Sequence, residues 1–228
     1  MKPLGVVLHV SASTWGDRAE IDLWHRQRGF AEIGYHKVIL NGHAKSGSAY
    51  DVARDGELQQ GRADSKQGAH CKMGGMNSCT FGICSVGEPG KLASGTTPAD
   101  ASLTKKPYLT QRQAQRLVDT VAKLCIQYGW KPKGTFKHPT RGVQIPVITQ
   151  HSDHDPANKP FCASLHLDAV RDAVERRIAQ IKATPGMAAA AGEKAKPVES
   201  LAPTGEEYDE EPASDVPPSP KASGPAEG

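Results

Sequence analysis

The residues of this chain that are best suited to chemistry are histidines and a cysteine far apart in the sequence. His9 stands inside the apolar run GVVLHV, and near the other end Cys162 follows His151 by eleven residues. A buried imidazole must be hydrogen-bonded or coordinated, because an unpaired polar group in an apolar setting is costly. Imidazole nitrogen and thiolate sulfur are good zinc ligands, and a catalytic zinc site uses three protein ligands. We therefore predict a catalytic site with one zinc ion per chain.

Spacing alone leaves two alternatives open. His9 could be a hydrogen-bonded core residue with no ligand, which is the common role of a lone histidine in a strand. His154 could replace His151, because both lie in the same loop. We favour His151 because it is closer to the end of the last predicted strand.

Hydrophobic periodicity predicts the elements that must position these residues. Strands are expected at 4–10, 35–40, 56–62, 80–86 and 143–149, and helices at 17–28, 110–128 and 165–181. Thr110 and Gln113 fit a capping box at the start of the second helix. The pattern predicts an α/β domain with a central mixed β-sheet flanked by helices. His9 and His151 would follow the carboxyl ends of strands, where the loops of such sheets build sites.

Composition divides the chain into one domain, residues 1–182, and a tail, residues 183–228. The tail holds eight of the 17 prolines and nine acidic against three basic residues. Such a segment buries too little apolar surface to offset its ordering entropy, so we expect a disordered acidic tail. Because the whole chain has a formal charge of +3, the tail's −6 implies +9 on the domain.

A basic domain favours an anionic partner, which could be a nucleic acid, a membrane surface or a cell-wall polymer. Charge alone does not choose among them. The sequence has no apolar run of membrane-spanning length and no convincing secretory signal, so a cytoplasmic protein is expected. The cysteines number five, which favours thiols or metal ligands over disulfides in a reducing compartment.

Several segments, taken in order, carry a family pattern: VLHVSAS from residue 7, WHRQRGFAEIGYH from residue 24, Gly61-Arg62, Gly68-Ala69-His70, Asn77 and GICSVG from residue 82. They resemble the motifs of zinc-dependent N-acetylmuramoyl-L-alanine amidases, which include amidase-type phage lysozymes and peptidoglycan recognition proteins. The resemblance runs from about residue 4 to about residue 180. It does not reach the tail.

The resemblance implies that His9, His151 and Cys162 bind zinc, and that Tyr35 and Lys159 are catalytic. Zinc polarises a carbonyl and lowers the pKa of a coordinated water. Lys159 would stabilise the negative charge that develops on the carbonyl oxygen, and Tyr35 would orient water or move a proton.

Other matched residues receive smaller roles. His70 and Asn77 are expected to flank the cleft and to contact the glycan or peptide, although turn chemistry explains Asn77 equally well. Arg62 is expected either to pair with a substrate carboxylate or to be a surface residue. His36 alternates with Tyr35 along the strand, so it should face the opposite side and make a structural hydrogen bond.

The sequence departs from the family pattern at three places. Ala163-Ser164 follows Cys162 where the family usually has proline, and insertions span residues 43–54 and 87–106. The insertions could reshape the cleft, so the preference for a peptide stem does not transfer.

The resemblance implies hydrolysis of the amide between N-acetylmuramic acid and L-alanine in peptidoglycan, by a monomeric phage or prophage endolysin that waits in the host cytoplasm. No nucleic-acid partner is expected. One alternative is a cytosolic wall-recycling amidase acting on soluble muropeptides, although those relatives more often have aspartate at the position of Cys162. The other alternative is a non-catalytic peptidoglycan-binding module. The presence of all five site residues argues against it.

Overall fold

A computed structural model describes residues 1–184 of the chain. Its elements are β1 (Gly5–Val10), α1 (Arg18–Gln27), β2 (Lys37–Asn41), β3 (Asp55–Gln60), the 3-10 helix η1 (Met73–Ser78), β4 (Thr80–Ser85), α2 (Gln111–Tyr128), β5 (Thr135–Lys137), β6 (Gln144–Pro146), β7 (Ile148–Gln150), α3 (His151–His154) and α4 (Leu167–Ala183). The expected α/β class with a central mixed sheet is confirmed.

The central sheet has five strands in the order β3-β2-β4-β1-β7. Strand β1 pairs in parallel with β4 and with β7, and β2 pairs in parallel with β4. Strands β2 and β3 are antiparallel neighbours. Because β1 and β7 run in the same direction, their carboxyl ends meet at one edge of the sheet.

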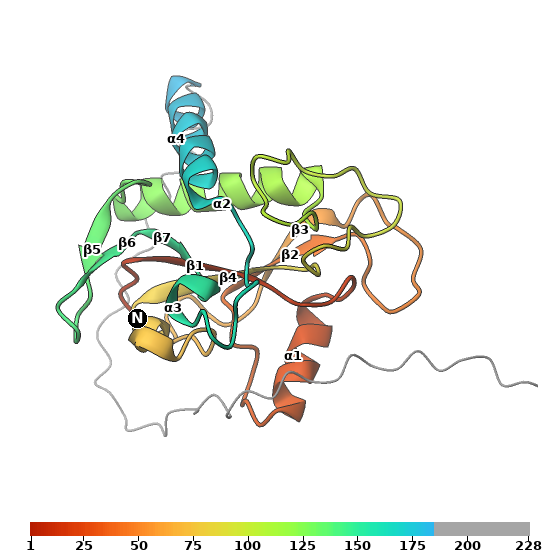
Figure 1. Cartoon of the computed structure of the whole chain (residues 1–228), viewed down its shortest axis with the longest axis horizontal. Helices are drawn as coiled ribbons and strands as arrows, with labels where there is room; N and C mark the ends of the chain where they lie inside the picture. Colours follow the sequence, from red (N-terminus) through yellow and green to blue (C-terminus); the bar gives the residue numbers. More distant parts are fainter. Residues whose placement is uncertain (185–228) are drawn as a thin grey trace, which may run out of the picture.

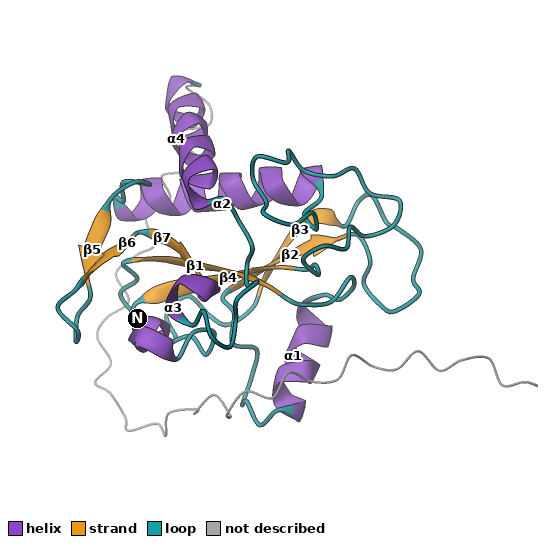
Figure 2. Ribbon diagram, viewed as in Figure 1, coloured by secondary structure: helices purple, strands orange, loops and turns teal. Residues whose placement is uncertain are grey.

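Helices cover both faces of this sheet (Figures 1 and 2): α2 and α4 lie on one side and α1 on the other. Alternate residues of β1 therefore enter different environments. Val6, Leu8 and Val10 pack in the main core with α2 and α4. Val7 belongs to a smaller cluster on the opposite face, and His9, two residues further, projects to that same face.

The capping box predicted for α2 is present. The Thr110 side chain accepts from the Gln113 N–H, and the Gln113 side chain accepts from the Thr110 N–H. Gln113 also donates to the carbonyl of Ile39 on β2 and to that of Val86, the residue after β4. The cap therefore joins the helix to the sheet as well as starting it.

The last predicted strand, 143–149, is divided in the structure. Its first part, β6, pairs with β5 in a separate two-stranded hairpin, and β7 alone joins the central sheet. Val147 lies between them, and its carbonyl accepts from the Val6 N–H of β1. The apolar pattern runs without interruption through both strands, so the sequence did not indicate the change from one sheet to the other. The hairpin partner β5 was not predicted.

The two insertions pack against each other. The His43 ring contacts the carbonyl of Ser48 within its own insertion and the carbonyl of Ser94 in the other. The second insertion also reaches the loop that carries Cys162, where Lys106 Nζ lies 3.6 Å from the centre of the Phe161 ring. The insertions therefore border the edge of the sheet where the predicted site lies.

Helix α4 ends at Ala183, close to the predicted boundary at residue 182. The predicted disordered tail lies, from residue 185 onward, outside the described residues. Within residues 1–184, no helix combines the length and apolar character needed to cross a membrane.

Candidate metal centre

His9 and His151 are brought together by the pairing of β1 with β7. Leu8 pairs with Gln150, and the residue that follows each of them is a histidine: His9 within β1 and His151 at the start of α3. The two rings lie 4.7 Å apart, centre to centre, and both residues are buried. The parallel register thus juxtaposes two imidazoles that are 142 positions apart in sequence.

Cys162 completes the group from the loop after α3. The Ser152 N–H donates to the Cys162 carbonyl and fixes the loop to α3. The Val10 N–H donates to Cys162 Sγ over 3.4 Å, which directs the sulfur toward the end of β1. The ligand atoms of His9, His151 and Cys162 all lie within 4.8 Å of one another.

The donor set fits zinc by its chemistry and by its spacing. Zinc–nitrogen and zinc–sulfur distances of about 2.05 and 2.3 Å in a tetrahedral site put the two donors about 3.6 Å apart. The distance from Cys162 Sγ to His9 Nδ1 is 3.7 Å. A group of two imidazoles and one thiol also leaves a fourth position open, as catalytic zinc sites do.

His154, the alternative ligand, points elsewhere. Its Nε2 lies 3.0 Å from the hydroxyl of Thr149, which itself donates to the carbonyl of Val6. The group of potential ligands includes His151 and leaves His154 out. The geometry therefore favours His151, as the sequence did.

Burial keeps all three candidate ligands uncharged while no metal ion is bound. Desolvation lowers the pKa of His9 well below its usual value and lowers that of His151 to about 4, so both imidazoles are neutral at neutral pH. Burial also raises the pKa of the Cys162 thiol to about 12, against the opposing effects of the Val10 N–H and Lys159. A bound metal ion reverses this last preference, because a coordinating thiol is deprotonated.

Tyr35 and Lys159 both lie beside the ligands. The Tyr35 ring is 5.0 Å from the His9 ring. Burial raises the pKa of the neighbouring Cys84 thiol well above its usual value, and a hydrogen bond with Tyr35 offsets part of that effect. The charge of Lys159 acts on His9, on His151 and on Cys162. The structure thus gathers all five residues for which the sequence suggested zinc binding or catalysis.

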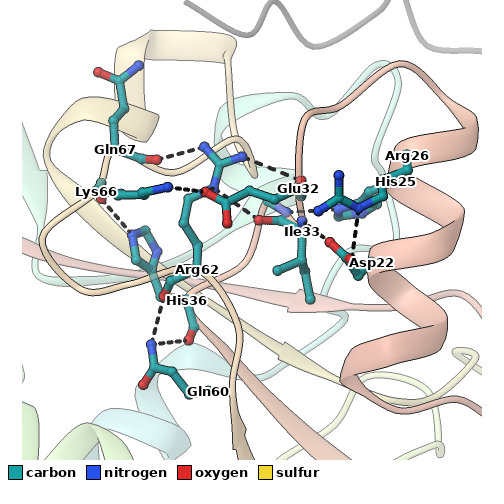
Figure 3. Close-up of polar contacts among 11 residues, drawn as sticks. Asp22, His25, Arg26, Glu32, Ile33, His36, Gln60, Arg62, Lys66 and Gln67 are labelled. Carbon is teal, nitrogen blue, oxygen red and sulfur yellow. Dashed lines mark hydrogen bonds and ion pairs between the residues drawn. The ribbon is translucent and has the colours of Figure 1, made fainter. Parts of the chain in front are cut away.

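The three residues expected to contact substrate are instead engaged by the protein. Arg62 is 6% exposed and donates to the carbonyls of Ile33 and Gln67 (Figure 3). The side chain of Asn77 accepts from the N–H groups of His70 and Cys71. Both side chains therefore support the loops around the site, which for Asn77 is the turn role that the sequence also allowed, and a contact of either residue with substrate stays a prediction.

His70 also departs from its expected role, because it is buried behind the ligands. Its ring nitrogens contact His9 and the carbonyl of Thr80. His36 makes the structural hydrogen bonds expected of it, accepting from the Gly82 N–H and contacting the Lys66 carbonyl (Figure 3). Sequence reasoning missed the contact of His70 with His9; the only signal was the pair of glycines, Gly68 and Gly82, that flank its ring.

The fold is a mixed α/β sheet with two histidines at the carboxyl edge of its parallel strands and a cysteine brought beside them by a loop, a group compatible with a metal ion. Comparison with known families is more specific. The model of the N-acetylmuramoyl-L-alanine amidase family matches residues 1–160, and this chain belongs to that family. The match includes His9, Tyr35, His151 and Lys159, and it ends two residues before Cys162.

Individual relatives include phage endolysins. The chain is 32% identical over 109 residues to an endolysin of Klebsiella phage KP32, covering 48% of this chain and 56% of the relative. It is 34% identical over 83 residues to the endolysin of Escherichia phage T7, covering 35% of this chain and 45% of the relative. These matches span about half the length of the curated relatives.

Solved structures support the fold. The N-acetylmuramoyl-L-alanine amidase LysC from Clostridium intestinale URNW superimposes with a TM-score of 0.52 at 19% identity, covering 77% of this chain and 87% of that one. At this identity the likeness concerns the architecture alone.

The buried histidines predict an acid-sensitive fold when metal is removed. Burial lowers the pKa of His25 to about 3 and that of His36 to about 4, so the unfolded chain binds protons that the native chain does not. Stability from these groups is complete above about pH 6.5 and is lost as the pH falls to about 4 for His36 and to about 3 for His25. We expect each histidine to contribute a slope of about 1.4 kcal/mol per pH unit in that window.

Urea unfolding of the chelated protein at a series of pH values measures this slope. His36→Gln removes one titrating group. The slope of its unfolding free energy between pH 4 and pH 6 should therefore be smaller by about 1.4 kcal/mol per pH unit, which corresponds to one proton. A free energy of unfolding that stays constant across this window would contradict the expectation.

Proposed function

We propose that this protein is a zinc-dependent N-acetylmuramoyl-L-alanine amidase that hydrolyses the amide between N-acetylmuramic acid and L-alanine in peptidoglycan. The observation that carries the proposal is the group formed by His9, His151 and Cys162, with Tyr35 and Lys159 beside it, in a chain of this family. The catalytic unit is residues 1–182, and residues 183–228 form an acidic tail.

Each residue of the group has a defined task. His9, His151 and Cys162 hold one zinc ion, which when bound supplies a Lewis acid to polarise the scissile carbonyl and to activate water. Lys159 places a positive charge where the amide oxygen becomes negative, and such a preset charge lowers the barrier most. Tyr35 orients the attacking water or moves a proton between it and the leaving amine.

The biological setting that we propose is a phage or prophage endolysin, held in the host cytoplasm until it reaches the wall. The similarity to phage endolysins supports this setting over the other two candidates. The formal charge of +9 on residues 1–182 suits an anionic wall polymer. Cys162 argues against a recycling amidase, and the full set of site residues argues against a binding-only module.

The decisive experiment is mass spectrometry of purified peptidoglycan after incubation with the zinc-loaded protein. We expect glycan strands freed from peptides, and peptides with new L-alanine amino termini. Cleavage of soluble muropeptides with an untouched sacculus would instead indicate the recycling activity. Binding to the sacculus without any cleavage of either substrate would indicate a binding module.

Replacing Lys159 with methionine tests the charge beside the ligands. We expect kcat to fall about 10²- to 10³-fold, the usual effect of removing one group that stabilises an oxyanion. Zinc affinity should stay the same or rise slightly, because a cation that opposes Zn²⁺ is lost. Steady-state kinetics and chelator competition measure the two effects.

Lys133→Met is the matched control, because Lys133 pairs with Asp172 and Glu175 of α4 and its loss removes the same charge from the domain. If both variants lost activity equally, the effect would come from the overall charge, and the assignment of Lys159 would fail.

A further inference from the structure

A chain of hydrogen bonds extends from the candidate zinc ligand His9 into the protein interior. His9 uses Nδ1 toward Cys162, while its Nε2 lies 3.1 Å from His70 Nδ1. His70 Nε2 in turn lies 3.2 Å from the carbonyl oxygen of Thr80. All three residues are at most 2% exposed, so water does not compete for these contacts.

The Thr80 carbonyl at the end of this series of hydrogen bonds determines which nitrogen of each imidazole carries the proton. Because the Thr80 oxygen can only accept, His70 must carry a proton on Nε2 and donate it. In a neutral ring, His70 Nδ1 is then an acceptor, and His9 must donate to it from Nε2. His9 Nδ1 is consequently unprotonated, and its lone pair faces the sulfur of Cys162.

The opposite arrangement is incompatible with zinc. If both nitrogens of His70 carried protons, His9 Nε2 would have to accept, and a neutral His9 would carry its proton on Nδ1. That proton would occupy the side of the ring that faces Cys162. Zinc binding by His9 Nδ1 therefore requires the neutral form of His70 as an acceptor.

The surroundings of His70 hold its ring in one place. A Cβ added to Gly68 would lie 2.4 Å from His70 Cδ2, and one added to Gly82 would lie 2.4 Å from His70 Cγ. Neither glycine has a positive φ, so what these positions require is space and not an unusual backbone. Asn77 also accepts from the His70 N–H at 2.7 Å.

We propose that His70 is a positioning residue that holds His9 in the tautomer able to bind zinc through Nδ1. The proposal rests on the proposed zinc-dependent function. Metal-binding histidines usually donate their second N–H to a carboxylate, a carbonyl or water, and loss of that partner costs about 10- to 100-fold in metal affinity. Here an imidazole takes that place and transmits the polarity of the Thr80 carbonyl to His9.

Zinc affinity of His70 variants, measured by chelator competition, tests the proposal. His70→Phe keeps a ring but removes the acceptor, and we expect zinc affinity to fall about 10- to 100-fold. His70→Asn can offer an amide oxygen near the position of Nδ1, and we expect it to stay within about threefold of the original protein, well inside that range.

His36→Phe is the matched control. His36 is another buried histidine with two hydrogen bonds, and its ring centre lies 5.7 Å from that of His70, but it contacts none of the three candidate ligands through the bonds described. We expect its zinc affinity to be unchanged. Equal losses in His36→Phe and His70→Phe would overturn the proposal, as would an unaltered affinity in His70→Phe.

Nitrogen NMR of the chelated original protein gives a readout that does not depend on any variant folding. We expect both His9 and His70 to carry their proton on Nε2. A proton on His9 Nδ1 would refute the positioning role even if zinc binds. Conversely, the expected tautomers in a protein that binds no zinc would support the hydrogen-bond chain and refute the zinc-dependent function.

Discussion

Replacing Cys162 with alanine is expected to remove both zinc binding and amidase activity. Structural zinc sites with four protein ligands bind with about 10–16 kcal/mol, or about 2.5–4 kcal/mol per ligand. Loss of the thiolate should therefore weaken zinc about 10²- to 10³-fold, and two neutral imidazoles remain to hold a dication. Zinc content after gel filtration and release of peptides from peptidoglycan measure the two losses.

Two further variants make this result specific. Cys125→Ala removes another buried cysteine, which packs in the main core within α2, and should leave zinc and activity unchanged. Cys162→Asp replaces the thiolate with another zinc ligand and should restore part of the metal affinity. A zinc-free but active Cys162→Ala protein would refute the proposed site.

The sequence predicted the α/β class and the main strands and helices because their signals are local. The apolar run of β1, the antiparallel partners β2 and β3, and the capped helix α2 were all visible as periodicity or end signals. Since sites in such sheets form at the carboxyl ends of strands, the juxtaposition of His9 with His151 could also be anticipated.

Other features depend on contacts that a single sequence does not display. The hairpin of β5 and β6 was missed because β5 has only three residues and one apolar side chain, Phe136. Helix α3 has four residues, too few for a helical period to appear. The pairing of His70 with His9 joins residues 61 positions apart and follows from the approach of the loop before η1 to β1, which no local pattern encodes.

The substrate contacts predicted for Arg62 and Asn77 stay predictions, and the hydrogen bonds of both side chains within the protein favour a supporting role instead. A motif match identifies residues that a family retains, but it does not separate residues that contact substrate from residues that support the loops. The Arg62 guanidinium donates hydrogen bonds to the backbone carbonyls of Ile33 and Gln67 (Figure 3). Only burial and hydrogen bonding distinguish such a residue from a substrate ligand.

Replacing Tyr35 with phenylalanine is expected to lower kcat about 10²- to 10⁴-fold, the range for loss of a group that moves a proton. Phenylalanine retains the ring that packs 5.0 Å from His9 and 5.2 Å from His25, so the cluster should keep its shape. Because only the hydroxyl is lost, zinc affinity should be unchanged. Tyr35→Phe should therefore lose catalysis and keep metal binding, whereas Cys162→Ala should lose both.

Steady-state kinetics with a soluble muropeptide, across a range of pH, provide the measurement. If Tyr35 moves a proton, one limb of the pH profile of kcat should change in the variant along with its height. Tyr128→Phe is the matched control, since Tyr128 stacks on Trp130 at the end of α2 and should tolerate loss of its hydroxyl. A Tyr35→Phe protein with full kcat and an unchanged profile would limit Tyr35 to packing against His9. The proposed assistance to the reaction would then rest on Lys159.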